Sequence, residues 1–177
     1  MNKGVIYYTR IREEYQNTHL EHMIGDKLLE TALKQERNIK LSEEPRGVGE
    51  HGKPFLSYRP GVHYNISHSG AYVVCVLADQ EVGIDIQIHR EVNYDRMLRR
   101  MVTEKEREEI LKRPDLEQEF FRQWVIREAF IKWTGEGLSR DLRKISEKEG
   151  VCRFLNLPER EKGYSCALWS ADPIEIT

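Results

Sequence analysis

Short runs of apolar residues separated by turn residues fill the first half of the chain. Val5 to Tyr8 predicts a strand, and apolar residues at helical spacing predict a helix from about Thr18 to Lys34. A glycine-containing loop is expected from Ser42 to Gly52. Three strands bounded by Gly, Asn or Asp are expected next, over Val62 to His68, Ala71 to Ala78 and Val82 to Ile88.

The last two of these strands differ in their patterns. Ala71 to Ala78 is apolar throughout, which is typical of a strand buried on both faces. In the next strand Val and Ile alternate with Gly83, Asp85 and Gln87, so the two sets face opposite sides. One face is expected to join the core, and Asp85 shares the other face with Gln87.

Helices open the second half of the chain. Thr103 to Glu106 is a capping-box sequence that begins a helix. Asp115 is expected to cap a long helix from about Leu116 to Thr134, closed by Gly135 or Gly137. Strands are expected afterwards over Ile145 to Glu147, Val151 to Leu155 and Tyr164 to Ala171.

A faint internal repeat relates the two halves. Gly70 to Asp79 resembles Gly163 to Asp172, since each has a glycine, an aromatic residue, an apolar run with a cysteine, and Ala-Asp. We therefore expect an α+β fold of two similar halves, residues 1–90 and 91–177, packed as one compact unit.

Composition narrows the class of protein. Of 177 residues, 39% are hydrophobic and the formal net charge is −2, so the chain is globular and has no overall attraction to nucleic acid or anionic membranes. The longest apolar run, Tyr72 to Ala78, is too short to span a bilayer, and the early charges do not form a signal sequence. Cys75, Cys152 and Cys166 lack metal-ligand spacing, so reduced thiols in a cytoplasmic protein are expected.

The long helix carries candidate chemistry. Trp124, Glu128 and Lys132 are four residues apart and line one side of it. An ordinary Glu–Lys pair, which stabilises a helix by about 0.2–0.5 kcal/mol, is one interpretation. The aromatic residues around the pair favour another, because a buried charge needs a partner such as a metal or a phosphate.

Two strand segments offer further polar groups. Asp85 follows Gly83, which would let a ligand or another backbone approach, although a solvated acid on a sheet face is the alternative. Asn65 to Gly70 could cradle a phosphate or could be a polar turn. A hydrolytic pair of Ser67 and His68 is disfavoured, because neighbours in a strand point to opposite faces.

Four blocks of the sequence together resemble the 4′-phosphopantetheinyl transferases, specifically the monomeric type that activates surfactin synthetase. The blocks occur in that family's order, and they are Gly52 to Pro54, Asn65 to Gly70, Val82 to Ile86 and Trp124 to Lys132. Gly135 to Leu138 continues the likeness. The resemblance implies two α+β halves related by pseudo-twofold symmetry, with the active site in the cleft between them.

The resemblance also implies roles for individual residues. The catalytic residues would be Asp85, Glu128 and Lys132, with Glu128 as a candidate base. Asp85 and Glu128 would coordinate Mg²⁺, a hard ion that prefers oxygen ligands. Contacts to coenzyme A would come from Lys53, Ser67, His68, Asp85 and Lys132.

The implied reaction is transfer of 4′-phosphopantetheine from coenzyme A to a serine of an apo acyl or peptidyl carrier protein. A hydroxyl attacks the β-phosphate, and adenosine 3′,5′-bisphosphate leaves. A monomer would suffice. The alternatives are a coenzyme A- or nucleotide-binding module that has lost transfer activity, and an unrelated metal-dependent phosphohydrolase, for which no activating motif is present.

The sequence departs from the family pattern at several points. Gln87 stands where a third acid is common, so we expect it to be a marginal metal ligand. Arg127 replaces a usual lysine. The region before residue 50 is shorter than usual, and its basic segment for the 3′-phosphate is not evident. Candidate replacements are Arg10, Arg12, Lys27 and Arg46.

The carrier protein could dock on the segment from Arg96 to Met101. It combines cations with apolar groups, which suits an acidic partner that presents a helix. The alternative is an amphipathic helix packed on the core.

Overall fold

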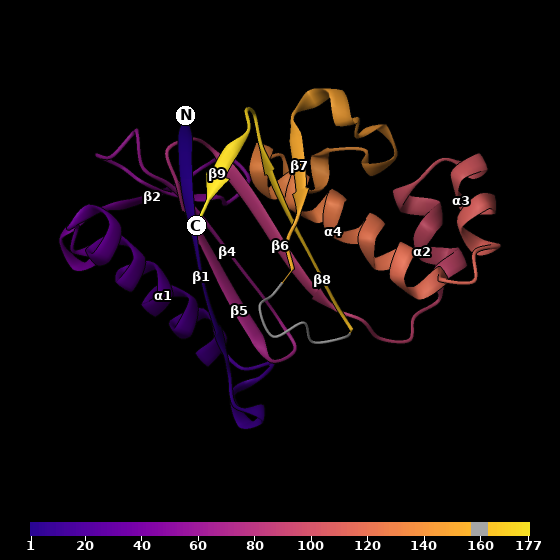
Figure 1. Ribbon diagram of the computed structural model, residues 1–177, viewed down its shortest axis with the longest axis horizontal. Coiled ribbons are helices and arrows are strands. Elements are labelled where there is room, and N and C mark those ends of the chain that lie inside the picture. The colour runs from indigo at the N-terminus through magenta and orange to yellow at the C-terminus, as the bar shows by residue number, and fades with distance from the viewer. Residues whose placement is uncertain (157–162) are drawn as a thin grey trace.

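The computed structural model describes residues 1–156 and 163–177. Its helices and strands form an α+β fold, as the sequence predicts (Figure 1). One sheet has the strand order β4-β5-β1-β9, and a second has the order β6-β8-β7. The strands of the first sheet are β1 (Asn2–Arg10), β4 (His63–Ser69), β5 (Tyr72–Ala78) and β9 (Ile174–Ile176). Those of the second are β6 (Val82–Ile88), β7 (Val151–Phe154) and β8 (Tyr164–Ser170).

The first sheet packs against α1 (Leu20–Arg37), which confirms the predicted first helix. Leu29, Ala32 and Leu33 from α1 meet Cys75 and Leu77 from β5. Every residue of β5 is buried, as its continuous apolar run predicts. This strand lies between β4 and β1, so it is an interior strand of its sheet.

The two sheets share a core, and α4 (Leu116–Thr134) covers the outer face of the second sheet. Val82, Ile84 and Ile86 of β6 pack into the core that the sheets share, which confirms the predicted apolar face. Asp85 lies on the opposite face, toward α4, and Lys132 of α4 contacts it. The alternation along β6 therefore directs its acid to the helix that carries the other candidate residues.

Two short helices form one end of the molecule (Figure 1). They are α2 (Tyr94–Met101) and α3 (Glu104–Leu111), which bury a small core against the start of α4. The capping box of Thr103 and Glu106 at α3 is confirmed. Asp115 is the N-cap residue of α4, as predicted, but its carboxylate makes no capping hydrogen bond and pairs with the Arg113 guanidinium, with Nε to Oδ1 at 2.8 Å. Gly135 closes α4 in a left-handed conformation.

Two segments differ from their predicted structure. The loop expected from Ser42 to Gly52 contains β2 (Arg46–Val48), which pairs with β3 (Pro54–Leu56). The strand expected over Ile145 to Glu147 is absent from the described chain, since Ser146 caps a 3₁₀ turn there instead. The 3₁₀ turns are Glu13–Tyr15, Leu41–Glu43, Gly137–Ser139, Leu142–Lys144 and Glu147–Glu149.

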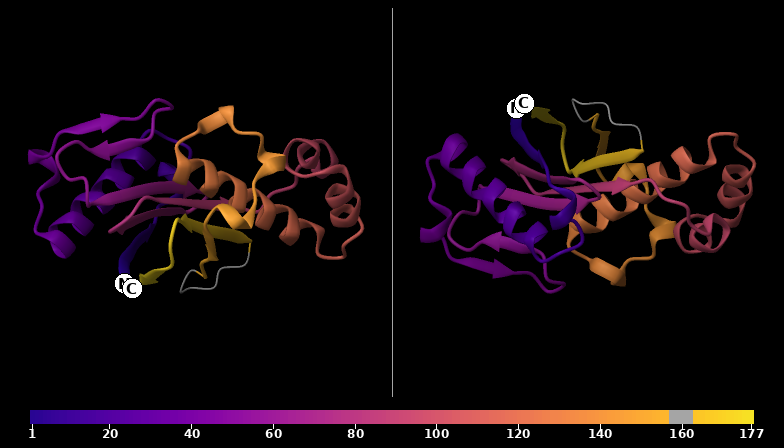
Figure 2. Two further views of the ribbon diagram at one scale, coloured as in Figure 1. Left: turned by 90° about the horizontal axis from the view of Figure 1, so that it is seen from above. Right: turned by 90° about the horizontal axis from the view of Figure 1, so that it is seen from below.

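Pairing between strands joins distant parts of the chain. β6 pairs with β8, and β9 pairs with β1, so the first and last strands lie together (Figure 2). The boundary near residue 90 and the pseudo-twofold symmetry stay predictions. The three cysteines are free thiols. No helix within residues 1–156 and 163–177 is both long and apolar enough to cross a membrane.

Candidate active site

A cavity of about 500 Å³ lies where α1, β4, β6 and α4 meet. It contains nearly all of the predicted site residues, which are Ser67, His68, Asp85, Gln87, Glu128 and Lys132. Trp124 also lines it, so the side of α4 predicted from helical spacing is the side that faces the cavity.

Gly83 allows α4 to approach β6 closely. A Cβ atom at this position would lie 2.2 Å from the carbonyl oxygen of Ala129 and 2.2 Å from the amide nitrogen of Trp133. Both contacts are with helix backbone, which cannot rotate away as a flexible side chain can. The absence of a side chain at Gly83 therefore sets the distance between the acid on β6 and the charged residues on α4.

Asp85 occupies the centre of this contact. Its Oδ1 accepts hydrogen bonds from Lys132 Nζ at 2.9 Å and from Ser67 Oγ at 3.2 Å. Its Oδ2 is buried and has no hydrogen-bond partner among the described residues. Burial raises the pKa of this carboxyl, while the Lys132 charge opposes the rise. An unpartnered buried carboxylate oxygen is costly, so it is a natural position for a cation.

Glu128 provides the second carboxylate of the cavity. Its pKa is raised by burial first and by the Asp85 charge second, while Lys132 lowers it. A divalent ion beside the two carboxylates would offset both the burial of each acid and the repulsion that Glu128 experiences from Asp85. No group of three or more His, Cys, Asp or Glu side chains in the described ranges could hold a metal. The site thus offers two carboxylates, and Gln87 adds a neutral amide whose nitrogen donates to the Ile88 carbonyl at 3.1 Å.

The polar block on β4 joins the two sheets through its side chains. Asn65 Oδ1 accepts from the Ile84 amide at 2.9 Å, and Ser67 Oγ accepts from the Ile86 amide at 3.1 Å. Ser69 Oγ accepts from the Ile88 amide at 3.0 Å. Side chains at alternate positions thus replace the backbone partners that β6 lacks on this edge. Ser67 therefore has a structural role beside its predicted contact with the coenzyme, which stays a prediction.

His68 points to the opposite face of β4 from Ser67 and also lines the cavity. Its Nδ1 lies 2.5 Å from Oε2 of Glu21, an almost fully buried residue of α1. Burial lowers the pKa of the His68 imidazole, and the Glu21 charge opposes this shift. Sequence reasoning did not find Glu21, because its partner lies 47 positions away and nothing in the pattern of α1 marks an acid at its buried face.

Arg46 is the candidate 3′-phosphate ligand that the structure brings to the cavity. Its guanidinium also pairs with Asp26 of α1, with Nη1 to Oδ1 at 2.8 Å. Lys27 pairs instead with Glu30 on the exposed side of α1, and Arg12 lies near Glu14. The Arg46 side chain of β2 thus brings a cation to the cavity beside α1, and its contact with the 3′-phosphate stays a prediction.

Lys53 does not line this cavity in the described structure. Its Nζ contacts Glu81 Oε2 at 2.7 Å, the Val82 carbonyl at 3.1 Å and the Trp133 carbonyl at 2.9 Å. These contacts tie the loop before β3 to the start of β6 and the end of α4. The predicted contact between this lysine and the coenzyme stays a prediction.

A pair of carboxylates, a lysine and a histidine surround one cavity. Comparison of the sequence with known proteins shows to which family this chain belongs. Residues 81–171, just over half of the chain, match the model of the 4′-phosphopantetheinyl transferase superfamily. The chain belongs to this superfamily. The matched segment contains both acids and Lys132, so the predicted family is confirmed.

Curated relatives carry the same family name. A 4′-phosphopantetheinyl transferase from Bacillus subtilis is 35% identical over 70% of this chain and 56% of its own length. The 4′-phosphopantetheinyl transferase Sfp of Bacillus subtilis strain 168 is 28% identical over 85% of this chain and 74% of its own length. The transferase psf-1 of Bacillus pumilus is 35% identical over 85% of this chain and 66% of its own length. The present chain thus spans little more than half the length of the first of these relatives.

Proposed function

We propose that the protein transfers the 4′-phosphopantetheine group of coenzyme A to a serine of an apo acyl or peptidyl carrier protein. The observation that carries the proposal is the unpartnered Oδ2 of Asp85, which lies beside Lys132 in a cavity shared with Glu128. Membership of the superfamily supports the same reaction. The serine oxygen bonds to the β-phosphorus, and the bond to the adenosine 3′,5′-bisphosphate oxygen breaks with its electron pair.

Asp85 and Glu128 would hold Mg²⁺, with Gln87 as a weak neutral neighbour. Oxygen ligands from two carboxylates, with phosphate oxygens and water completing the shell, suit this ion. When bound, the ion would neutralise charge on the phosphates as the leaving group departs. The unpartnered oxygen of Asp85 and the mutual repulsion of the two acids support this assignment.

The chain's own residues have distinct tasks around the coenzyme. Lys132 Nζ, held by Asp85, donates to the pyrophosphate and stabilises the charge that develops there. Glu128 accepts the proton of the serine hydroxyl, directly or through one water. His68 contacts a phosphate, and Arg46 contacts the 3′-phosphate from the α1 side of the cavity.

Mass measurement of the carrier tests the reaction. The protein, Mg²⁺ and coenzyme A are incubated with several apo carriers, and each carrier should gain one phosphopantetheine. Reactions without coenzyme A provide the control. If no carrier gains mass while coenzyme A still binds in calorimetry, the protein is a coenzyme-binding module and the transferase proposal is wrong.

Gln87→Glu is expected to tighten Mg²⁺ binding about three- to tenfold, because a charged carboxylate replaces a neutral amide beside two acids. Calorimetric titration with Mg²⁺ measures the change. Gln118→Glu is the matched control, since this exposed residue adds the same charge at the start of α4. Weaker Mg²⁺ binding in Gln87→Glu than in the control would show that the metal does not approach this position.

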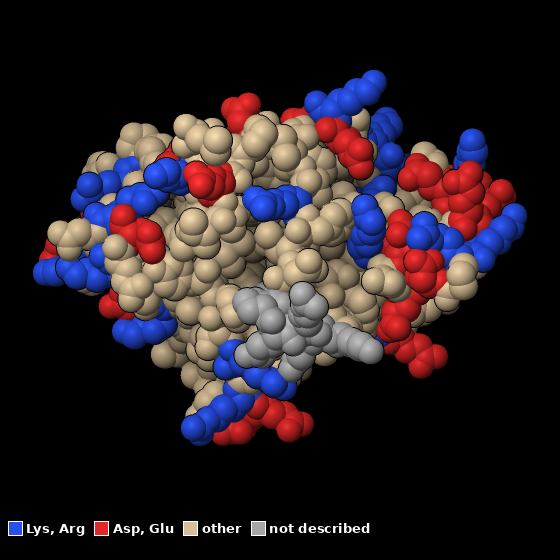
Figure 3. All heavy atoms as spheres, in the orientation of Figure 1, with Lys and Arg blue, Asp and Glu red and all other residues tan. Residues whose placement is uncertain are grey.

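The carrier is proposed to dock beside Glu128 over α2. A second cavity of about 390 Å³ extends from Glu128 past Arg99, Arg100 and the fully exposed Leu138. Figure 3 shows acidic and basic side chains interspersed over the α2–α3 end on the face drawn there. Cations and an apolar group beside the catalytic acid suit an acidic carrier helix next to its serine.

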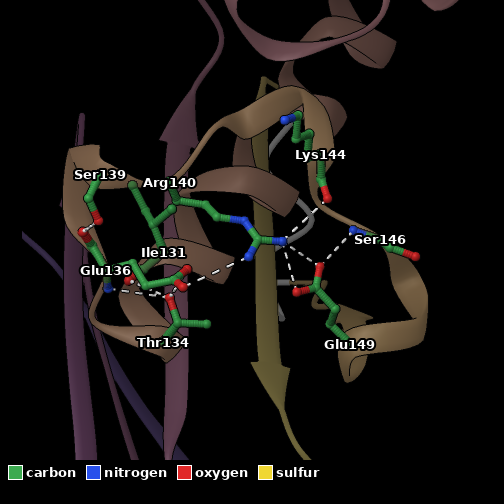
Figure 4. A network of polar contacts seen from close by, with 8 residues as sticks. All are labelled: Ile131, Thr134, Glu136, Ser139, Arg140, Lys144, Ser146 and Glu149. Carbon is green, nitrogen blue, oxygen red and sulfur yellow. Dashed lines mark hydrogen bonds and ion pairs between the residues drawn. The ribbon is translucent and has the colours of Figure 1, made fainter.

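Arg140 at this cavity and Arg127 nearby on α4 are held by contacts within the fold. Arg140 Nη2 contacts the Glu149 carboxylate at 2.7 Å, and Nη1 lies 3.8 Å from Glu136 (Figure 4). Arg127 is buried and donates to the Met101 carbonyl, which anchors the end of α2 to α4. The docking contacts are therefore assigned to two exposed residues of the anchored helix, Arg100 and Arg99. The Arg99 guanidinium pairs with Asp95 at 3.2 Å, but this ion pair is open to solvent and can be exchanged for one with the carrier.

Reversing the charges of Arg99 and Arg100 to glutamate should raise the KM for the carrier at least about tenfold, with little change in the KM for coenzyme A. Steady-state kinetics at low and high salt measure the effect, which should shrink as salt rises. Lys34→Glu with Lys40→Glu, at exposed positions near α1, provides an equal change in net charge. An equal effect in both double variants would remove the docking assignment.

A further inference from the structure

A buried carboxylate on α1 has no role in the reaction as described above. Glu21 is 4% exposed and accepts a hydrogen bond from the Asn17 backbone N–H. Its Oε2 lies 2.5 Å from Nδ1 of His68. Carboxylates are seldom buried to this extent without partners that repay the loss of water. The pair joins α1 to β4 at the wall of the cavity.

The geometry of the pair fixes which ring nitrogen of His68 can meet a ligand. Nδ1 is occupied by Glu21, so Nε2, on the other side of the ring, is the nitrogen available to the cavity that His68 lines. The His22 ring packs edge-on against the His68 ring, with centroids 5.1 Å apart. These two contacts from α1 restrict rotation of the imidazole.

We propose that Glu21 is a positioning residue that holds His68 by Nδ1 and aims Nε2 at an anionic group of the bound coenzyme. The proposal rests on the proposed function, since it assumes that a phosphate enters this cavity. A carboxylate that accepts from one nitrogen of a histidine fixes its tautomer and makes the other nitrogen more basic. Glu21 would thus act through His68 without touching the substrate.

The charges around the ring explain why this support is needed. His22 on α1 and Lys132 on α4 oppose a positive charge on His68, while Asp85 on β6 and Glu21 favour it. Burial also disfavours the charge and lowers the pKa of the ring, and the contact of Nδ1 with the Glu21 carboxylate favours the neutral tautomer that carries its proton on Nδ1. When a phosphate arrives, a proton from solvent binds Nε2, and the imidazolium donates to an anion on each side.

Nitrogen-15 NMR of the imidazole tests the orientation without any substrate. In the ligand-free protein, His68 should carry its proton on Nδ1 above its pKa. Glu21→Gln keeps the shape but offers either an oxygen or an amide N–H, so a mixture of tautomers is expected. Glu21→Asp, which keeps the charge, should restore the Nδ1–H form, and Glu30→Gln on the exposed face of α1 should not change it. An unchanged tautomer in folded Glu21→Gln would overturn the proposal.

A double-mutant cycle tests the connection to binding. Calorimetry with adenosine 3′,5′-bisphosphate should show about a tenfold loss of affinity in Glu21→Gln. In a His68→Ala background the same change should cost less than about twofold, because the residue through which it acts is gone. Equal losses in both backgrounds would mean that Glu21 supports the fold generally, and the proposal would be wrong. Transfer by the wild-type protein is measured separately, so failure of the proposed reaction is distinguishable from failure of this pairing.

Discussion

Glu128→Gln should lower the rate of transfer by at least about 10²-fold while the protein remains folded. The change removes the proposed base, which is also one of the two carboxylates proposed to hold Mg²⁺, but it keeps the shape of a side chain that lines the cavity. Single-turnover transfer to an apo carrier, followed by mass, measures the rate. Calorimetric Mg²⁺ binding should weaken in parallel.

The stability of Glu128→Gln should not fall together with its transfer rate. Burial and the Asp85 charge raise the pKa of Glu128 in the folded protein. An acid whose folded pKa is raised favours folding at low pH, and its contribution is lost as pH rises through the unfolded value toward the folded one. Above this pH window the carboxylate opposes folding, so Glu128→Gln should there unfold at an equal or higher temperature.

Glu117→Gln is the matched control, because this exposed acid lies at the other end of α4. It should transfer at the wild-type rate. If Glu128→Gln were as active as this control, the assignment of the base and metal ligand would be wrong. A large fall in its unfolding temperature would instead show that the carboxylate stabilises the fold.

Local pattern was sufficient to predict most elements of the fold. Apolar alternation placed Asp85 on the face of β6 opposite the core, and four-residue spacing placed Glu128 with Lys132 on one side of α4. Each of these inferences depends only on the geometry of a single element. The bounds of α4 were also predictable, since a glycine ends it at Gly135.

Contacts between distant segments could not be predicted in this way. Ser67 meets Asp85 and Glu21 meets His68 only because β4 lies between β5 and β6 with α1 packed nearby. The contact of the Lys53 ammonium with the carbonyl of Trp133, 80 positions later, was likewise not predictable, and the contact of this lysine with the coenzyme stays a prediction. Such contacts depend on how the helices and strands pack. A charged residue in a sequence motif can either contact a ligand or hold two elements together, and the motif does not distinguish these roles.

The close approach at Gly83 leads to the prediction with the largest effect on the fold itself. In Gly83→Ala the new methyl group would meet the Ala129 carbonyl and the Trp133 amide, so α4 must move away from β6. Overpacking of this kind costs about 1–3 kcal/mol of unfolding free energy. A shift of about 1 Å between catalytic groups can cost about 10²-fold in rate, so transfer by the folded fraction should also collapse.

Gly61→Ala separates this effect from the general consequences of replacing glycine. A Cβ at Gly61 would have no neighbour within 4 Å, so its stability and transfer rate should stay close to wild type. Urea unfolding measures the free energy, and single-turnover transfer at urea concentrations that leave both variants folded measures the rate. If the two variants matched in both measurements, contact between α4 and β6 would not set the geometry of the site. If the free energy of unfolding fell in Gly83→Ala but the transfer rate did not, α4 would be able to move without separating Lys132 and Glu128 from Asp85. The reaction would then tolerate a larger displacement of α4 than the close packing of these three side chains suggests.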